Sequence, residues 1–391
     1  MHSIEEARHA ALSLVAPTRG VEVVLDEARG RVLVEDLFAA DDVPAAPTSM
    51  MDGYAVCSSG PTVRRLVQES AAGAPSHRAL ALDEAAPIST GALLPSGADA
   101  VIPVEDSVVE GVSVLLPPTT RGRFVRGPGS DLSRGEQLLA RGAVLDAVAV
   151  ALVAGQGLAT VRVADRPRVA VFSLGEELRR PDEPLSPGAL YDSNGPALAA
   201  ACEDAGARVE RQPLVPDQLG ALTTALRDAR ADLIVTSGGA SVGVHDHLRA
   251  AIVAAGGEVL LWRVAMKPGK PLVLGRIGRT PVVGLPGNPV SALVAFYLFV
   301  RPMIFSMLGR SDVELPRVRL PLAAALPPIG DRRELVRARI VKDARGVESL
   351  VPEPRQASSA LLGLARADAL IDCPPDLVAE VGDTLLALRL R

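Results

Sequence analysis

Residues 233–243 read LIVTSGGASVG and join a short apolar run to a loop of glycines and hydroxyl side chains. The run predicts a buried strand over Leu233–Thr236, and the next periodic segment, Asp246–Ala255, predicts a helix. Glycines let backbone amides approach an anion closely, while hydroxyls and a helix N-terminus add donors. A tight strand-to-helix turn explains the same residues without a ligand. Because glycines and hydroxyls occur together, we favour anion binding, although the loop lacks the Gly-Lys-Ser/Thr of a P-loop.

The alternation of strand and helix extends on both sides of this loop. From residue 168 onward, short aliphatic runs alternate with segments of helical periodicity. This order predicts a mostly parallel sheet covered on both faces, and ligands of such sheets bind beyond the carboxyl ends of the strands. The predicted strands are Val169–Leu174, Val209–Val215, Leu233–Thr236, Val259–Val264, Leu272–Arg276 and Val282–Leu285, and the predicted helices are Asn194–Ala205, Asp217–Ala229, Asp246–Ala255 and Val290–Met307.

The rest of the 391-residue chain predicts further domains, because this length exceeds one ordinary core. Near the N-terminus we expect a helix over 3–15 and a strand over Val21–Leu25, and a second helix over Val144–Val153 leads to a linker. Prolines 44 and 47 interrupt the chain before a region of short β-prone runs and glycine turns. The runs are Ala100–Val104 and Val112–Leu116 in this region, and Val318–Pro321, Leu335–Val341, Ala369–Ile371 and Thr384–Leu390 after Pro316.

These patterns predict a multidomain α/β plus β fold. Residues 1–40 and 141–165 form an N-terminal helical linker domain, and residues 41–140 form a β-rich inserted domain. The α/β domain spans 166–312, and a C-terminal β-barrel domain spans 313–391.

Composition excludes several classes of function. Aromatic residues make up 3% of the chain and the net charge is −5, so the sequence offers neither stacking surfaces nor a basic footprint for nucleic acid. Three widely spaced cysteines suit a reducing compartment rather than a disulfide framework. The N-terminus carries charges where a secretory signal would be apolar, and the apolar stretch Val290–Val300 stops at Arg301, too short for a bilayer. We therefore expect a cytoplasmic protein without a membrane or nucleic-acid partner.

Lysine is almost absent except in one turn. Residues 266–271 read MKPGKP, and Lys267 and Lys270 are two of only three lysines among 41 basic residues. A lysine ammonium is a compact, strongly hydrated point charge, unlike the arginine fork. The turn either places two charges for an anion or exposes them to solvent, and the segment alone does not decide between these readings.

A third polar loop follows the strand Val282–Leu285. Residues 284–291 read GLPGNPVS, in which Asn288 can cap a helix and Pro289 can take its first position. Helix initiation thus explains much of the motif and leaves Ser291 unexplained. Three such loops at one edge of a sheet indicate a ligand with more than one phosphate or oxyanion.

Acidic residues fall near the same edge. Glu177 follows the strand Val169–Leu174, and Asp246 follows the glycine-serine loop. Carboxylates beside phosphate donors usually hold a divalent cation, because their own charge would repel an anionic ligand. For Asp217, the N-cap of the following helix is at least as good an interpretation as a ligand role. His245 and His247 flank Asp246 but give only a weak metal signal.

Six motifs together resemble the molybdopterin molybdenumtransferase family, which contains MoeA and the gephyrin E domain. In chain order they are MDGYAV (51–56), STGA (89–92), YDSN (191–194), TSGGASVG (236–243), KPGKP (267–271) and GLPGNPVS (284–291). The resemblance implies four domains, an elongated L-shaped homodimer and a site where the α/β domain of one subunit meets the β-rich domain of the other. It also implies the reaction, in which adenylylated molybdopterin and molybdate, with Mg²⁺, give molybdenum cofactor and AMP. An anionic pterin and an oxyanion suit a site with several anion-binding loops.

The resemblance also implies roles for individual residues. Lys267, Lys270 and Ser291 resemble molybdate ligands, joined by Arg337 and Ser358 from the C-terminal domain. Glu177 and Asp246 resemble the essential acids that hold Mg²⁺ or assist cleavage of the adenylate, and Asp217 is a further metal candidate. Asp52, in the Asp-Gly turn of MDGYAV, and Thr90 resemble groups that complete the site across the dimer. The remaining substrate-binding candidates are the loop residues Ser237, Gly238, Gly239, Ser241, Gly243, Pro286, Gly287, Asn288 and Pro289.

The chain departs from the family pattern at several positions and leaves two alternatives open. Leu174 stands where the family usually has a threonine, Val244 replaces an acid, His247 a tyrosine, Arg263 a lysine and Ala357 a glycine. A specialised or non-catalytic paralogue acting as a dimeric scaffold is one alternative. The adenylyltransferase that makes the substrate is the other, but its single-domain form argues against it here. That adenylyltransferase and the enzymes that accept the cofactor are expected partners.

Overall fold

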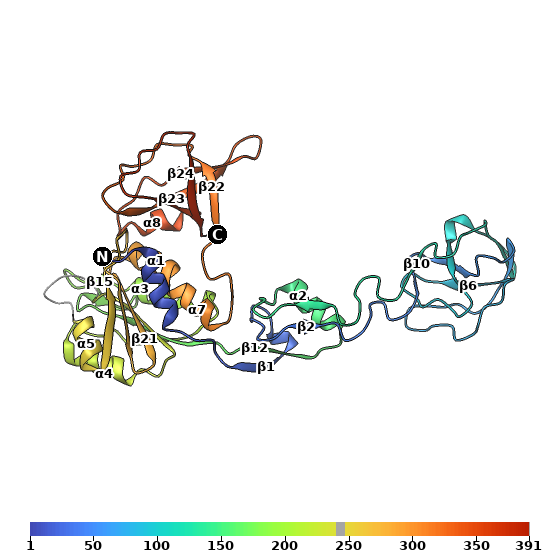
Figure 1. The fold of residues 1–391 in the computed structure, drawn as a ribbon, viewed down its shortest axis with the longest axis horizontal. Coiled ribbons are helices and arrows are strands. Elements are labelled where there is room, and N and C mark those ends of the chain that lie inside the picture. The colour runs from blue at the N-terminus through green and yellow to red at the C-terminus, as the bar shows by residue number, and fades with distance from the viewer. Residues whose placement is uncertain (240–246, 391) are drawn as a thin grey trace. The chain divides into compact units, whose positions relative to one another are not determined.

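The computed structural model describes residues 1–239 and 247–390. The chain forms two compact units, one comprising Met1–Val34, Gly142–Asp146 and Thr160–Arg391, the other Glu35–Arg141 and Ala147–Ala159 (Figure 1). Each unit is described here by itself.

A six-stranded sheet forms the centre of the first unit. Its strands are β13 (Arg168–Ser173), β16 (Arg208–Arg211), β17 (Leu233–Ser237), β18 (Gly257–Trp262), β20 (Val273–Ile277) and β21 (Thr280–Leu285), in the order β16-β13-β17-β21-β20-β18. The pairs β16/β13, β13/β17 and β17/β21 are parallel, while β20 is antiparallel to both of its neighbours. The predicted mostly parallel sheet is therefore confirmed, with β20 as the reversed strand.

Helices cover both faces of this sheet (Figure 1). On one face α3 (Asn194–Asp204) packs with α1 (Ile4–Ser13), α6 (Pro289–Ala295) and α7 (Arg301–Met307); on the other lie α4 (Leu219–Asp228) and α5 (Leu248–Ala254). Strand β13 serves both cores, since Val169 and Val171 belong to the first and Ala170 and Phe172 to the second. Successive side chains of a strand point to opposite faces, so a continuous apolar run is what a doubly covered strand needs.

One long helix runs through the core of the first unit. Helix α6 continues through a π-helical turn, Phe296–Val300, into α7. The predicted helix Val290–Met307 is therefore confirmed, and it continues past Arg301, the residue that ends its uninterrupted apolar stretch. Within the described part of the chain, Pro289–Met307 is the one helix long and apolar enough to cross a membrane, and 78% of its most apolar window is buried in the protein. Burial in a folded core explains that apolar character.

The N-terminal segment contributes helix α1, which packs on this core, and a strand that pairs with a distant part of the chain. Helix α1 begins with a capping box in which Ser3 accepts from the Glu6 backbone and Glu6 accepts from the Ser3 backbone. Strand β1 (Gly20–Val24) pairs with β12 (Thr160–Ala164), far away in sequence. The predicted helix over 3–15 and strand over Val21–Leu25 are confirmed within two residues of their ends.

The C-terminal strands curl into a small barrel. They are β22 (Arg317–Pro321), β23 (Arg333–Lys342), β24 (Glu348–Pro352), β25 (Ala369–Cys373) and β26 (Thr384–Arg389), with the short helix α8 (Leu361–Ala365) between β24 and β25. Strand β24 pairs with β23, and a bridge from Leu322 to Leu350 brings the end of β22 beside β24. Strand β24 and α8 were not predicted. The two-residue strand β19 (Met266–Lys267) pairs in parallel with the first two residues of β23, Arg333 and Glu334.

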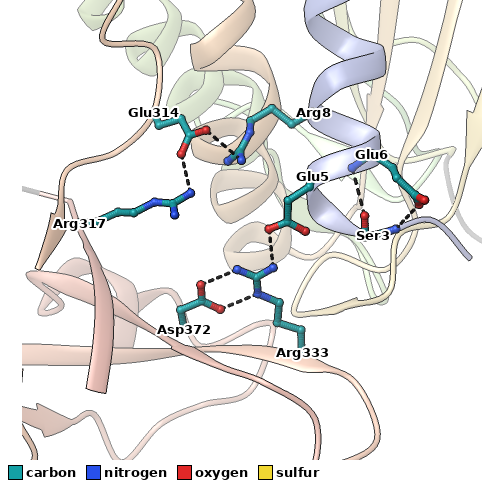
Figure 2. Close-up of polar contacts among 8 residues, drawn as sticks. All are labelled: Ser3, Glu5, Glu6, Arg8, Glu314, Arg317, Arg333 and Asp372. Carbon is teal, nitrogen blue, oxygen red and sulfur yellow. Dashed lines mark hydrogen bonds and ion pairs between the residues drawn. The ribbon is translucent and has the colours of Figure 1, made fainter. Parts of the chain in front are cut away.

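Ion pairs join α1 to this barrel (Figure 2). The guanidinium of Arg333 forms a two-fold pair with Asp372, at 2.6 and 2.5 Å, and its third nitrogen lies 2.6 Å from Glu5 on α1. These contacts hold the barrel against the helix that covers the α/β core.

The second unit is built mainly of short strands. Its largest sheet has the order β7-β4-β6-β5-β9-β8, comprising Ala100–Pro103, Gly53–Val56, Glu84–Ile88, Val63–Leu66, Ser113–Leu115 and Val108–Glu110. The β-rich character predicted for residues 41–140 is confirmed. Helix α2 (Ala147–Gly155) begins three residues later than predicted because Val144 instead bridges Val32 in an extended segment.

Candidate active site

A pocket of about 340 Å³ lies at the carboxyl ends of the parallel strands. It lies in the first unit, where ligands of such sheets are expected. Its lining combines the loop after β13, the segment before α3, the end of β17 and the start of α6. The residues that line it are Leu174, Glu177, Leu178, Leu190, Tyr191, Asp192, Ser193, Asn194, Ser237, Gly287, Asn288, Pro289 and Ser359.

Asn194 ties three of these elements together. Its side-chain nitrogen Nδ2 lies 2.7 Å from the hydroxyl of Ser237 and 2.7 Å from the carbonyl oxygen of Gly287. The amide therefore donates to the end of β17 and to the loop after β21 at the same time. Asn194 was not among the predicted site residues, although the YDSN motif that contains it was part of the resemblance.

Asp192 lines the same pocket, but its carboxylate is already engaged by hydrogen bonds from other residues of the protein. Its carboxylate accepts from the Ser173 hydroxyl at 3.0 Å, from the Gly195 backbone at 2.9 Å and from Arg211 at 2.9 Å. The residue is 2% exposed. With these partners it fixes the start of α3, so it is poorly placed to serve as a ligand of a metal ion.

The GLPGNPVS loop starts a helix as predicted, with one informative difference. Asn288 is the N-cap residue of α6 and Pro289 takes the first helical position, but the Asn288 side chain makes no capping hydrogen bond. The Val290 backbone instead donates to the Ser358 carbonyl at 3.1 Å. The amide of Asn288 thus lines the pocket and is available to a ligand, while Ser358 meets the helix start through its backbone. Ser291 is 4% exposed and lies deeper in the helix.

The glycine-serine loop turns sharply where it leaves β17. Gly238 has φ +90° and Gly239 φ +66°, and a Cβ on Gly238 would lie 2.5 Å from the Leu174 carbonyl oxygen. Only glycine tolerates both constraints. Gly287 is a neighbour, since a Cβ there would lie 3.8 Å from the Gly238 Cα. The predicted residues Ser241, Gly243 and Asp246, together with Val244 and His245, lie outside the described residues.

The two lysines of MKPGKP occur in different surroundings. Lys267 is paired with Glu334 of β23, with 3.0 Å between Nζ and Oε1; the lysine side chain is 52% exposed and the glutamate 9%. Lys270 is half-buried, and within residues 1–239 and 247–390 no hydrogen bond or ion pair engages its ammonium. The turn lies near α6, since a Cβ on Gly269 would lie 3.7 Å from the Ser291 carbonyl oxygen. Neither lysine lines the pocket described above.

Arg337 of β23 is wholly buried and supports the loop that carries Ser358. Its Nη2 donates to the carbonyls of Arg355 and Ala357, at 2.7 and 3.1 Å. Burial lowers the pKa of the guanidinium, with Glu353 opposing the shift. The Arg337 side chain therefore supports this loop without lining the pocket itself, whereas Ser359 of the same loop is one of the lining residues.

The predicted acids lie in three places. Glu177 lines the pocket, and among the described residues no ion pair or hydrogen bond engages its carboxylate. Asp217 does not line the pocket, and it is not the N-cap of α4 because Gln218 takes that position. Asp52 belongs to the second unit, where the Thr90 backbone and hydroxyl donate to its Oδ1 at 2.6 and 2.8 Å. These two bonds hold the pKa of the exposed Asp52 carboxyl below its usual range.

Four of the residues that depart from the family pattern can be placed in the structure. Leu174 is buried and gives the pocket an apolar wall instead of a hydroxyl. His247 is the N-cap residue of α5. The guanidinium of Arg263 lies 3.7 Å from the Trp262 ring centroid, a cation–π contact. Ala357 contributes the carbonyl that Arg337 holds.

The donor set of the pocket suits magnesium bound together with phosphate. Within the described ranges, no three His, Cys, Asp or Glu side chains gather as a metal cluster. Mg²⁺, however, is commonly held by one or two carboxylates, with phosphate oxygens and water as the other ligands. Glu177 provides one uncommitted carboxylate in the pocket that Asn288 also lines, so the residues present fit this mode of binding.

Comparisons with known proteins agree along the whole chain. Three family models match: the MoeA N-terminal region (domain I and II) over residues 2–157, a probable molybdopterin binding domain over 170–306, and the MoeA C-terminal region (domain IV) over 319–390. Molybdopterin molybdenumtransferase 2 of Mycobacterium tuberculosis is 37% identical over 404 residues, covering 99% of this chain and 98% of that protein. Molybdopterin molybdenumtransferase of Haemophilus influenzae is 35% identical, with 81% and 80% covered.

Solved structures of MoeA proteins have the same overall fold as this chain. Two structures of a molybdopterin biosynthesis MoeA protein from Pyrococcus horikoshii each superpose with a TM-score of 0.84. They are 30% and 24% identical to this chain, and both cover all of it, with 99% and 100% of their own chains matched. Together with the family models and the relatives, this match shows that the chain belongs to the molybdopterin molybdenumtransferase family of transferases, whose members include the MoeA proteins.

Proposed function

We propose that this protein inserts molybdate into adenylylated molybdopterin, with Mg²⁺, to give molybdenum cofactor and AMP. The observation that carries the proposal is the pocket in which Asn194 holds Ser237 and Gly287 together beside the start of α6. Hydroxyl, amide and helix-start donors at one point suit a ligand that carries phosphates. Family membership supplies the identity of that ligand, because the relatives are named for transferring molybdenum to molybdopterin.

In this proposal the pocket binds and orients the phosphates of the adenylylated pterin. Asn288 lines the pocket, and its side-chain amide is available to the phosphates because it makes no capping hydrogen bond. The Ser237 hydroxyl keeps its place through Asn194, so the binding groups are fixed before the ligand arrives. Preorganised donors lose less entropy on binding than mobile ones, which favours precise placement of the reacting bond.

The lysine turn captures molybdate as the second substrate. Lys270 has an ammonium that the described residues leave uncommitted, and Lys267 exchanges its bond to Glu334 for one to the oxyanion. Ser291 and Ser358 complete the binding of molybdate. Arg337 acts indirectly in this scheme, by fixing the carbonyls of the loop that carries Ser358.

Glu177 would hold Mg²⁺ at the phosphate end of the pocket. When bound, the ion supplies positive charge that neutralises phosphate oxygens and the AMP leaving group. Asp246 and Asp217 remain candidates as further ligands or as acids that assist cleavage; Asp246 lies outside the described residues.

The proposal includes a cytoplasmic homodimer with the four domains expected from the sequence. Asp52 and Thr90 would act from the second subunit, with Asp52 held ionised by the donors of Thr90. The molybdopterin adenylyltransferase and the cofactor-accepting enzymes would be its partners.

Release of AMP from adenylylated molybdopterin tests this function. Purified protein should release AMP only when molybdate and Mg²⁺ are both present, and E177Q should lose most of that activity while keeping its unfolding midpoint. E183Q, in the same region but outside the pocket lining, is the matched control and should keep full activity. A wild-type protein that dimerises but releases no AMP under these conditions would support the scaffold alternative.

Complementation between inactive subunits tests the homodimer. D52N and E177Q proteins should each be inactive, and mixed subunits should regain about a quarter of wild-type activity, because half of the dimers are mixed and each then contains one intact site. Failure to regain activity, with mixed dimers demonstrated by mass, would place Asp52 and Glu177 in the same subunit's site or outside it.

A further inference from the structure

The largest cavity among those described, about 650 Å³, lies away from the candidate active site. Its lining contains five arginines and two aspartates in a chain whose net charge is −5. The described residues that line it are Thr18, Arg19, Arg31, Asp165, Arg166, Arg168, Arg208 and Asp232, all in the first unit. Positive charge is therefore concentrated here against the overall balance of the protein.

The cavity lies at the amino ends of the parallel strands. Arg168 is the first residue of β13, Arg208 the first residue of β16, and Asp232 directly precedes β17. The candidate active site lies at the opposite ends of β13 and β17, a strand length or about 17 Å away. The two sites thus have separate linings and share no residue.

Both aspartates of the cavity already form ion pairs with arginines. Asp232 is paired with Arg168 at 2.9 Å, and Asp165 with Arg19 at 3.2 Å. These pairs account for two arginines and both aspartates. Three arginines remain, so the cavity keeps a surplus of positive charge.

The three remaining guanidiniums are Arg31, Arg166 and Arg208. Arg31 uses Nη2 to donate to the Ala164 carbonyl at 2.8 Å and has no carboxylate partner in the described chain. Arg166 and Arg208 are exposed, and among the described residues neither makes a side-chain hydrogen bond or ion pair. Burial and the neighbouring charge of Arg166 lower the pKa of Arg31. Asp165 and Glu27 oppose this shift without reversing it, so the repulsion between Arg31 and Arg166 is only partly offset.

We propose that this cavity binds a small anion that carries two or more linked phosphates, free or as part of a nucleotide. Arginine presents a planar fork that matches phosphate oxygens in pairs, and three guanidiniums without a paired carboxylate around one cavity suit several phosphate groups. No aromatic side chain is among the described residues that line it, so recognition is directed at the phosphate chain rather than at a base. The site is distinct from the one proposed for the pterin and molybdate.

Calorimetric titration of the full-length protein with tripolyphosphate and with ATP, at low ionic strength, tests the proposal. Tripolyphosphate should bind, and R166Q/R208Q should weaken that binding about tenfold or more, since two charge-assisted contacts are lost. K267Q/K270Q, altered in the candidate active site, and R230Q/R319Q, which removes the same charge from exposed positions outside the cavity, should bind as the parent does. Equal binding of ATP would identify the phosphate chain as the ligand in both sources, whereas much tighter binding of ATP would assign the site to nucleotides.

Stability gives a second readout that separates binding from structure. If Arg166 and Arg208 serve a ligand, R166Q/R208Q should unfold at the same midpoint as the parent or slightly higher, because the repulsion with Arg31 is relieved. Equal tripolyphosphate affinity in R166Q/R208Q and the parent, loss of affinity only in K267Q/K270Q, or absence of binding in the parent would each overturn the proposal. So would a marked fall in the unfolding midpoint of R166Q/R208Q, which would make the two arginines structural.

Discussion

The side-chain nitrogen of Asn194 lies 2.7 Å from the hydroxyl of Ser237, which joins the start of helix α3 to the end of strand β17. The same nitrogen reaches the carbonyl of Gly287 in the loop after β21, also at 2.7 Å. One amide thus sets the spacing of three chain segments at the carboxyl edge of the sheet. The pocket exists in its observed form because this spacing is fixed.

Replacing Asn194 by alanine should therefore damage the site more than the fold. N194A removes two hydrogen bonds and should lower the free energy of unfolding by about 1–2 kcal/mol. Displacement of the loops should lower AMP release by about 10- to 100-fold, because small misplacements of binding groups are costly to the reaction. N194D keeps the shape but loses the donor, and it should be as impaired as N194A. Normal activity in N194D would contradict the bridging role.

The ion pair between Lys267 and Glu334 should regulate the affinity for molybdate. K267Q should raise the KM for molybdate about tenfold or more, because a cation that receives the oxyanion is lost. E334Q should lower this KM, since it removes a carboxylate that competes for the lysine and repels the incoming anion. Initial rates over a molybdate series at constant ionic strength measure both effects. A higher KM in E334Q would mean that Glu334 mainly positions the lysine.

Arg333 should contribute strongly to stability, because Asp372 depends on it. The Asp372 side chain is 6% exposed, and R333Q would leave it without its cation. We expect a loss of about 2–3 kcal/mol in the free energy of unfolding, measured by urea denaturation. R345Q, whose ion pair with Asp343 is largely exposed, is the control and should change stability by less than about 0.5 kcal/mol. Similar values for the two variants would contradict the importance of burial.

The contact between Arg333 and Glu5 should also add a pH dependence to stability. Burial raises the pKa of Glu5, but the hydrogen bond and charge of Arg333 outweigh it and lower the pKa below the usual value. A carboxyl whose pKa is lower in the folded state stabilises the protein above its unfolded-state pKa, about 4.3, and this contribution is lost as pH falls through the folded-state pKa. R333Q should flatten the stability profile in that acid range. A profile parallel to that of the parent would show that Glu5 titrates independently of Arg333.

Thr90 should control the ionisation of Asp52. The backbone of Thr90 is the first cause of the lowered pKa, and its hydroxyl is the second. T90V keeps the backbone bond and removes the hydroxyl, so the pKa of Asp52 should rise part of the way to its usual value. A carboxyl-detected NMR titration measures the shift, and T119V, at a threonine away from Asp52, should leave it unchanged. An unaltered pKa in T90V would contradict the role of the hydroxyl.

Much of the architecture could be predicted from local pattern. The alternation of aliphatic runs with periodic segments predicted the parallel sheet, and β13 and β17 begin and end within one residue of their predicted bounds. Strand β16 is shorter than predicted, ending at Arg211 rather than Val215, although Val215 still forms a parallel bridge to Leu174 just beyond β13. Strand β24 and helix α8 were missed, since short elements derive their stability from contacts with the barrel rather than from their own periodicity.

The sequence by itself determined the order of strands and helices, the loops that leave the carboxyl ends, and the family, because these follow from periodicity and from short motifs. Only the tertiary structure decided which side chains are available. The carboxylate of Asp192 is engaged by hydrogen bonds from three residues, Ser173, Gly195 and Arg211. Lys267 is paired with Glu334, which lies 67 residues away in the sequence. Arg337 is buried and hydrogen-bonded to the loop that it supports. The gathering of five arginines around one cavity, from positions between Arg19 and Arg208, was equally invisible in the sequence. Pairing, burial and repulsion depend on distances between segments far apart in the chain, and no local pattern contains those distances.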